Sequence, residues 1–116
     1  MPFGFEDLKI YQRALDLVAR VYCILVKFPA HEMYVLSSQL RRAVISIALN
    51  IAEGTGRSKK DFSHFLDIAR TSAYECVACL TIAMRRGYIV QAQYEDLYKE
   101  FSELTRMINS LKQKLQ

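Results

Sequence analysis

Apolar residues recur along the chain at steps of three and four, the spacing that places them on one face of an α-helix. A first helix is expected to end at Phe28-Pro29, because proline disfavours helical backbone in the residue before it. Its apolar stripe is formed by Leu8, Tyr11, Leu15, Val18, Tyr22 and Leu25, widened by Ala14, Val21 and Phe28. A second helix is expected from about Met33 to Glu53, with Gly54 as the kind of residue that commonly follows a helix C-terminus.

Two further helices are predicted in the second half of the chain. The third runs from about Lys59 to Arg86 and is closed by Gly87. Its stripe is formed by Phe62, Leu66, Ala69, Ala73, Cys76, Leu80 and Ala83. The fourth begins at about Ala92 and carries the stripe Leu97, Phe101, Leu104, Ile108, Leu111 and Leu115.

The connections between these helices decide the topology. Helices of about 20 to 28 residues span about 30 to 40 Å, and the segments 29–34, 54–60 and 87–91 are too short to cross that length. Neighbouring helices must therefore run antiparallel. With only four glycines and two prolines in 116 residues, the sequence predicts an all-α fold, an antiparallel up-down-up-down four-helix bundle forming a single domain over residues 1–116.

The second helix has an unusual polar face. Its apolar side is formed by Leu36, Leu40, Ala43, Val44, Ile47 and Ile51, and its opposite side by Ser38, Arg42, Ser46, Asn50 and Glu53. A solvated helix face usually carries Glu and Lys in pairs four residues apart, whereas this one carries small hydroxyls, an amide and one arginine. The third helix has a comparable outer face of Thr71, Glu75, Ala78 and Ile82. We expect self-association through Ser46, Asn50, Glu53, Thr71 and Glu75.

Basic residues concentrate in the same part of the chain. The protein has a net charge of +4 and a pI near 9.1. Residues 40–60 contain five cations against the single acid Glu53, a balance equal to the whole net charge; these cations are Arg41, Arg42, Arg57, Lys59 and Lys60. Arg70 adds to them from the third helix. Clustered Arg and Lys neutralise phosphates, so the pattern predicts nucleic-acid binding through these six residues.

The sequence contains no helix-turn-helix and no stacked aromatic motif, the usual devices for reading bases. We therefore expect the protein to contact the nucleic-acid backbone or to recognise the shape of the nucleic acid. Two other interpretations remain open. The cations can belong to a solvated loop and to helix ends, where Arg85 and Arg86 favour the helix dipole. Alternatively, the chain is a structural or protein-interaction module whose basic patch meets an acidic protein.

Motifs for catalysis or metal binding are weak. Asp61-x-x-His64 has the spacing of a di-iron bundle motif but occurs once, where such sites need it on two helices. Cys76-x-x-Cys79 lies in the middle of a long helix, whereas redox and zinc pairs lie at turns or helix N-termini. We therefore expect both thiols to pack as small apolar groups, and we expect no enzymatic activity, metal or cofactor.

The start of the chain lacks the basic and apolar regions of a signal peptide, and no segment reaches the roughly 18 to 20 apolar residues of a membrane span. Three cysteines, an odd number without framework spacing, fit reduced thiols. The sequence predicts a cytoplasmic protein.

The central motifs resemble those of a known family. Gln39-Leu40-Arg41-Arg42-Ala43, Ser46-Ile47 and Asn50-Ile51-Ala52-Glu53-Gly54 are similar to the signature of the four-helix-bundle proteins encoded in intervening sequences of bacterial 23S rRNA genes. Phe5-Glu6-Asp7-Leu8 and Phe65-Leu66-Asp67-Ile68-Ala69-Arg70 extend the resemblance over nearly the whole chain.

This resemblance implies a bundle that assembles as a homopentameric ring. A related bundle is the accessory protein of diversity-generating retroelements, which binds nucleic acid and a reverse transcriptase. Neither family is known to be catalytic. Together with the basic residues, the resemblance predicts a non-enzymatic homo-oligomer that binds structured RNA or another nucleic acid.

Overall fold

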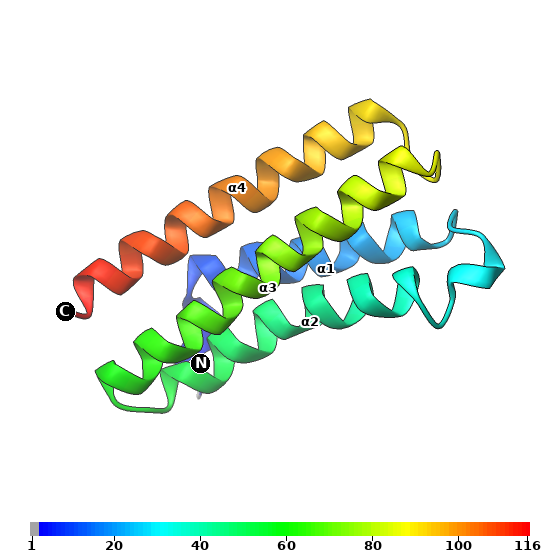
Figure 1. Cartoon of the computed structure of the whole chain (residues 1–116). Helices are drawn as coiled ribbons and strands as arrows, with labels where there is room; N and C mark the ends of the chain where they lie inside the picture. Colours follow the sequence, from blue (N-terminus) through cyan, green and yellow to red (C-terminus); the bar gives the residue numbers. More distant parts are fainter. Residues whose placement is uncertain (1–2) are drawn as a thin grey trace.

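Four long α-helices and two short 3₁₀ turns make up the computed structural model, which describes residues 3–116 (Figure 1). The helices are α1 (Lys9–Leu25), α2 (Leu36–Thr55), α3 (Lys59–Arg85) and α4 (Gln91–Lys114), and the turns are η1 (Gly4–Asp7) and η2 (Ala30–Glu32). The described residues contain no β-strand, so the predicted all-α class is confirmed. Residues 1 and 2 of the predicted domain lie outside the described residues.

Successive helices point in opposite directions along a bundle of 42 × 22 × 22 Å (Figure 1). Side-chain contacts show that the first and last helices, α1 and α4, are also antiparallel. Arg13 contacts Glu103 and Arg20 contacts Asp96, so rising numbers on one helix face falling numbers on the other. Each helix packs on two others: α1 and α3 both lie against α2 and α4. The order is that of the predicted bundle, with α2 and α3 in the most extensive contact.

Each helix contributes one apolar stripe to a common core. The predicted stripes of α3 and α4 face this core, and only their end residues Phe62, Leu111 and Leu115 are partly exposed. The predicted stripe of α1 was displaced. Its buried residues are Ile10, Ala14, Leu17 and Val21. Leu15 and Tyr22 are 38 % and 45 % exposed, because α1 is apolar on both flanks and its periodicity does not fix the centre of the stripe.

The prediction that Gly54 ends the second helix was wrong. α2 continues to Thr55, and Gly54 is buried inside it. A Cβ atom at Gly54 would lie 2.7 Å from a ring carbon of Phe62 and 2.9 Å from the Cβ of Phe65. The glycine therefore lets α3 approach α2 closely. Periodicity does not distinguish a glycine that packs against a neighbour from one that ends a helix.

The ends of α3 follow the expected local rules. At its start the backbone N–H of Asp61 donates to the Oγ of Ser58, 3.2 Å away, as in an ordinary N-cap. At its end Gly87 has a φ of +79°, and the N–H of Tyr88 donates to the carbonyl of Ala83 at 2.9 Å. Gly87 therefore closes α3 as predicted.

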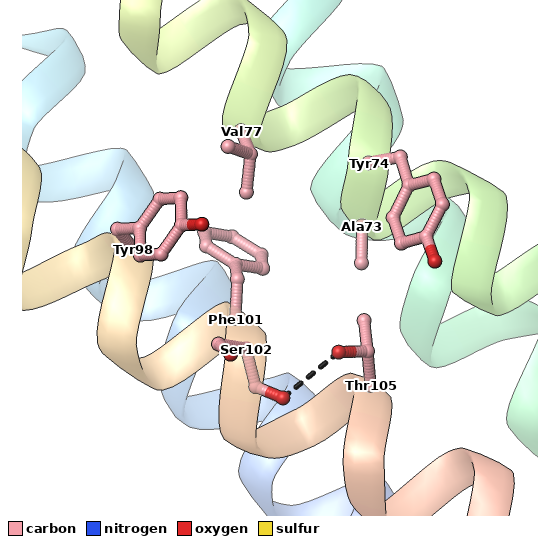
Figure 2. Close-up of a pocket in the computed structure, with 7 residues that line it drawn as sticks. All are labelled: Ala73, Tyr74, Val77, Tyr98, Phe101, Ser102 and Thr105. Atoms are coloured by element: carbon pink, nitrogen blue, oxygen red, sulfur yellow. Dashed lines mark hydrogen bonds between the residues drawn. The ribbon is translucent and has the colours of Figure 1, made fainter.

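The loops at one end of the bundle are joined to each other. The Tyr88 hydroxyl, after α3, donates to the carboxylate of Glu32 in η2 at 2.8 Å. The Tyr88 ring lies 5.5 Å from the ring of Phe28 between centres. Away from these loops, α3 and α4 leave an open groove along the middle of their contact (Figure 2). None of the helices formed by residues 3–116 is long and apolar enough to span a lipid bilayer.

Candidate nucleic-acid interface

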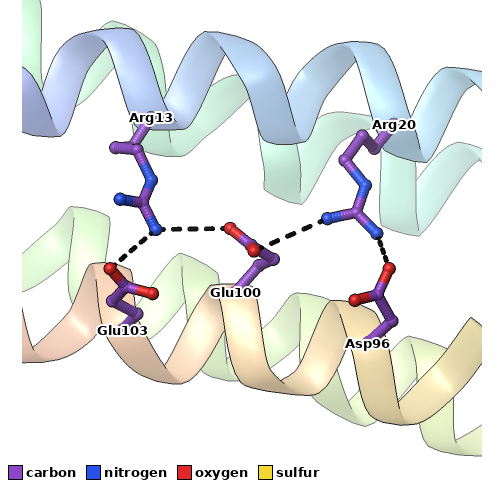
Figure 3. A network of polar contacts seen from close by, with 5 residues as sticks. All are labelled: Arg13, Arg20, Asp96, Glu100 and Glu103. Carbon is purple, nitrogen blue, oxygen red and sulfur yellow. Dashed lines mark hydrogen bonds and ion pairs between the residues drawn. The ribbon is translucent and has the colours of Figure 1, made fainter.

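Two arginines of α1 form ion pairs with acids of α4. Arg13 lies 3.3 Å from Glu100 and 3.0 Å from Glu103 (Figure 3). Arg20 contacts Asp96 and lies 3.9 Å from Glu100. The hydrogen bond to Glu103, with the charges of both glutamates, raises the pKa of Arg13. These arginines are therefore already neutralised by acids of the same chain.

The positive charge belongs to α2, α3 and the loops beside them. Residues 36–90 contain eight Lys and Arg and four Asp and Glu, which gives +4, the net charge of the whole protein. Residues 1–35 contain four of each sign, and so do residues 91–116. An acidic partner is therefore attracted to the α2–α3 half of the bundle.

Three of the predicted cations lie at the turn between α2 and α3. Arg57, Lys59 and Lys60 are exposed there. The guanidinium of Arg57 lies 3.3 Å from the Glu53 carboxylate and 5.0 Å from the centre of the Phe65 ring. Within residues 3–116, neither lysine forms an ion pair. The turn thus has one anchored guanidinium and two free ammonium groups.

Arg41 and Arg42 lie away from this turn. They precede Arg57 by about fifteen residues, and at 1.5 Å per residue this places them about 20 Å along the helix. Arg42 is exposed toward α3, whereas Arg41 is partly buried and about 100° away around the helix. Neither forms an ion pair with another described residue. The structure therefore does not gather the predicted cations into one cluster.

Arg70 belongs to a different face. Its guanidinium lies 3.6 Å from Asp67 and donates to the Tyr74 hydroxyl at 3.2 Å, on the side of α3 that faces α4. Asp67 also accepts a hydrogen bond from Lys112 of α4. That bond, with the charges of Lys112 and Arg70, lowers the pKa of Asp67. Arg70 is thus part of an α3–α4 contact.

A row of polar residues joins α2 to α3, and we call it the polar seam. It is formed by Gln39, Arg42, Ser46, Asn50, Ser72 and Glu75. The hydroxyls of Ser46 and Ser72 lie 2.9 Å apart, and the Asn50 amide donates to the carbonyl and hydroxyl of Ser46 at 2.8 and 2.9 Å. Gln39 donates to Glu75. A hollow of about 280 Å³ opens along the seam.

Of the five residues predicted to contact another subunit, three lie in the polar seam and two are exposed outside it. Ser46, Asn50 and Glu75 already have hydrogen-bond partners inside the chain. Glu53 is exposed and paired with Arg57, and Thr71 is exposed with its hydroxyl donating to the carbonyl of Ile68 at 3.0 Å. Their contact with a second copy stays a prediction.

The sequence reasoning missed a group of large, exposed apolar side chains on α1, α2 and the loop between them, which we call the apolar face. It is formed by Leu15 and Tyr22 of α1, Leu49 of α2, and Val26, Met33, Tyr34 and Val35 of the connecting loop. Leu49 is 61 % exposed although it lies within a long helix. The excess width of the apolar stripe in α1 is the sequence signal that could have revealed part of this set.

Cys76 and Cys79 are buried in the packing of α3, as predicted from their position. Burial raises the pKa of both thiols, so they stay protonated at neutral pH. Cys23 is exposed. Nowhere along residues 3–116 do three His, Cys, Asp or Glu side chains come together in a group that could hold a metal ion.

Comparison with known proteins identifies the family. The sequence matches the 23S rRNA-intervening sequence protein family over residues 6–110. Among solved structures, it is similar to a protein of unknown function from the S23 ribosomal protein family of Bacteroides thetaiotaomicron. That protein has 27 % sequence identity and a TM-score of 0.82, with 89 % of this chain and 97 % of that chain covered. No curated protein matches the chain. With the bundle and the central motifs, the match over nearly its full length shows that this chain belongs to the 23S rRNA intervening sequence protein family.

Proposed function

We propose that this protein is a non-enzymatic, oligomeric four-helix bundle that binds structured RNA through the cations of α2 and of the turn before α3. One observation carries the proposal. Arg42, Lys59 and Lys60 are exposed without an ion pair within the described chain, and they belong to the α2–α3 segment that carries the whole net charge, while residues 1–35 and 91–116 are each neutral. Unpaired cations are the ones that release counterions when they meet phosphate.

The distribution of these cations suits a polymer. Arg42 and the turn lysines lie about 20 Å apart along α2. A single small anion cannot span that distance, whereas a nucleic-acid backbone presents phosphates along its whole length. Because the contacts are to phosphate, they position the RNA and do not read its bases.

Self-association is the second part of the proposal. A closed ring of identical subunits needs two different patches on each copy. The apolar face supplies one, since exposed apolar patches of this kind mark interaction surfaces. Glu53, Thr71 and the polar seam supply the second, and the number of five subunits rests on family resemblance. A ring repeats the same cations around its circumference, so modest contacts add up through avidity.

The proposed location is the cytoplasm. Cys23, Cys76 and Cys79 are all free. Free thiols are typical of reducing compartments.

The test compares two charge-matched variants. Lys59→Gln with Lys60→Gln removes the free cations of the turn, and Lys9→Gln with Lys27→Gln removes two unpaired cations from α1 and its loop. We expect the turn variant to weaken binding of an RNA stem-loop several-fold and to reduce the slope of log affinity against log salt by about 0.7 to 0.9 for each lost contact. The α1 variant should bind like the wild type. Equal effects of the two variants would contradict a defined α2–α3 site.

A protein-interaction module is the second candidate function, and the apolar face favours it. A partner held by apolar contacts stays bound at high salt, whereas RNA held by phosphate contacts is released. Retention of one protein at high salt, without salt-sensitive RNA binding, would favour this candidate.

A further inference from the structure

The groove between α3 and α4 has an aromatic lining that the charge pattern does not predict. Its floor is formed by Ala73, Val77 and Phe101 (Figure 2). Tyr74 of α3 and Tyr98 of α4 lie on its opposite sides. The volume is about 250 Å³, just below the roughly 300 to 1,000 Å³ of sites for drug-sized ligands. The groove therefore suits one flat ring system.

The two tyrosines of the groove are unusually accessible. Tyr74 is 57 % exposed and Tyr98 is 50 % exposed. Tyr94, at the same helix contact, instead shares a hydrogen bond of 3.0 Å with Thr81 and is partly buried. Both groove tyrosines thus leave ring surface open to a partner.

Positive charge lies beside the groove. The guanidinium of Arg70 lies 5.3 Å from the centre of the Tyr74 ring. Arg106 follows Ser102, a lining residue, by four positions and shares its side of α4. Arg106 is exposed and has no ion pair within the described chain.

The acids near the groove do not cancel this charge. Asp67 is shared by Arg70 and Lys112. Glu95, one turn before Tyr98, is followed by the exposed Lys99. The surroundings of the apolar groove are therefore net positive and complement a polyanion.

We propose that this groove is a stacking site for an unpaired nucleobase of RNA, with Arg70 and Arg106 contacting the flanking phosphates. Unpaired bases in loops and bulges are recognised by stacking on aromatic side chains and on arginine. This inference rests on the proposed function and assigns the single-stranded parts of the RNA to a second face, distinct from the turn between α2 and α3.

The test uses two probes, an oligoadenylate of about ten nucleotides that contains one 2-aminopurine and a blunt RNA duplex of similar length. Tyr74→Ala with Tyr98→Ala should weaken oligoadenylate binding about tenfold or more. It should also abolish the quenching of 2-aminopurine fluorescence that accompanies stacking. Duplex binding should not change. Tyr74→Phe with Tyr98→Phe keeps both rings and should retain affinity and quenching.

Phe3→Ala is the matched control, since the Phe3 ring is 61 % exposed just before η1, which packs on α1 and α2 and not on the groove. It should leave both probes unaffected. Unchanged affinity and quenching in the double alanine variant would overturn the stacking site, while wild-type duplex binding would leave the proposed function standing. Loss of oligomer mass in the double alanine variant, measured by light scattering, would show that the groove holds a second copy of the chain. That result would also overturn the stacking site. If the wild-type protein bound neither the oligoadenylate nor the duplex, both proposals would be overturned.

Discussion

Single residues of the polar seam show how the family motif is used. Ser46 and Asn50 are part of that motif, and their side chains bond to Ser72 or to each other between α2 and α3. Small hydroxyls let the two helices approach, and each such bond contributes about 0.5 to 1.5 kcal/mol. Arg42 lines the same hollow but forms no ion pair with another described residue. It is thus the residue of the seam that stays available to an external phosphate.

Thiol reactivity provides a prediction at this scale. Because Cys76 and Cys79 are buried with raised pKa values and Cys23 is exposed, we expect one fast-reacting thiol in the native protein. A thiol reagent such as Ellman's should modify Cys23 at once, and the other two only after unfolding. The Cys23→Ser variant should lose the fast phase. Rapid modification of more than one thiol in the native state would contradict the packing of α3.

The helices themselves were largely predictable, since long apolar repeats bounded by Pro29, Ser58 and Gly87 are strong local signals. The stripe of α1 and the role of Gly54 were not, because both depend on which neighbour packs where. The candidate site was predictable only as a set of cations. The pair of Arg57 with Glu53 was missed because the helix was expected to end at Gly54. Sequence spacing also did not reveal that Arg70 faces α4 or that two tyrosines flank a groove.

The close approach of α2 and α3 predicts the effect of a methyl group at Gly54. Gly54→Ala places a Cβ less than 3 Å from Phe62 and Phe65, and overpacking of this kind costs about 1 to 3 kcal/mol. Alanine regains about 1 kcal/mol of helix propensity, so we expect a net loss of up to about 2 kcal/mol. Gly56→Ala is the control, because its Cβ would meet nothing closer than 3.9 Å. Urea unfolding measures both, and a gain in stability in Gly54→Ala, as helix propensity alone would give, would contradict the close approach.

At the scale of the whole molecule, the two halves of the bundle differ in charge. The α1–α4 side holds Arg13 and Arg20 in ion pairs that tie the first helix to the last. The α2–α3 side keeps the net positive charge, and the apolar face lies over α1 and α2. In a ring of such subunits, the contact through the apolar face lies apart from the cations proposed to bind RNA.

This separation predicts that assembly can be disrupted through the apolar face. Leu49→Glu places a carboxylate on an exposed apolar position. Removing that carboxylate from water in an interface is costly. The oligomer mass should therefore fall toward the 13.4 kDa of one chain. Ala92→Glu, at the exposed start of α4, is the control and should keep the wild-type mass. Size exclusion with light scattering decides it. An unchanged mass in Leu49→Glu would exclude the apolar face from the contact.

The most direct test of the central claim is the salt dependence of RNA binding by the wild-type protein. Fluorescence anisotropy with a labelled RNA stem-loop, repeated between about 50 and 200 mM salt, gives the slope of log affinity against log salt. Four phosphate contacts, from Arg41, Arg42, Lys59 and Lys60, predict a slope of about −3 for each subunit that touches the RNA, and an affinity that falls about fiftyfold or more over this range. Binding that does not change with salt, or no binding at any salt concentration, would contradict the account.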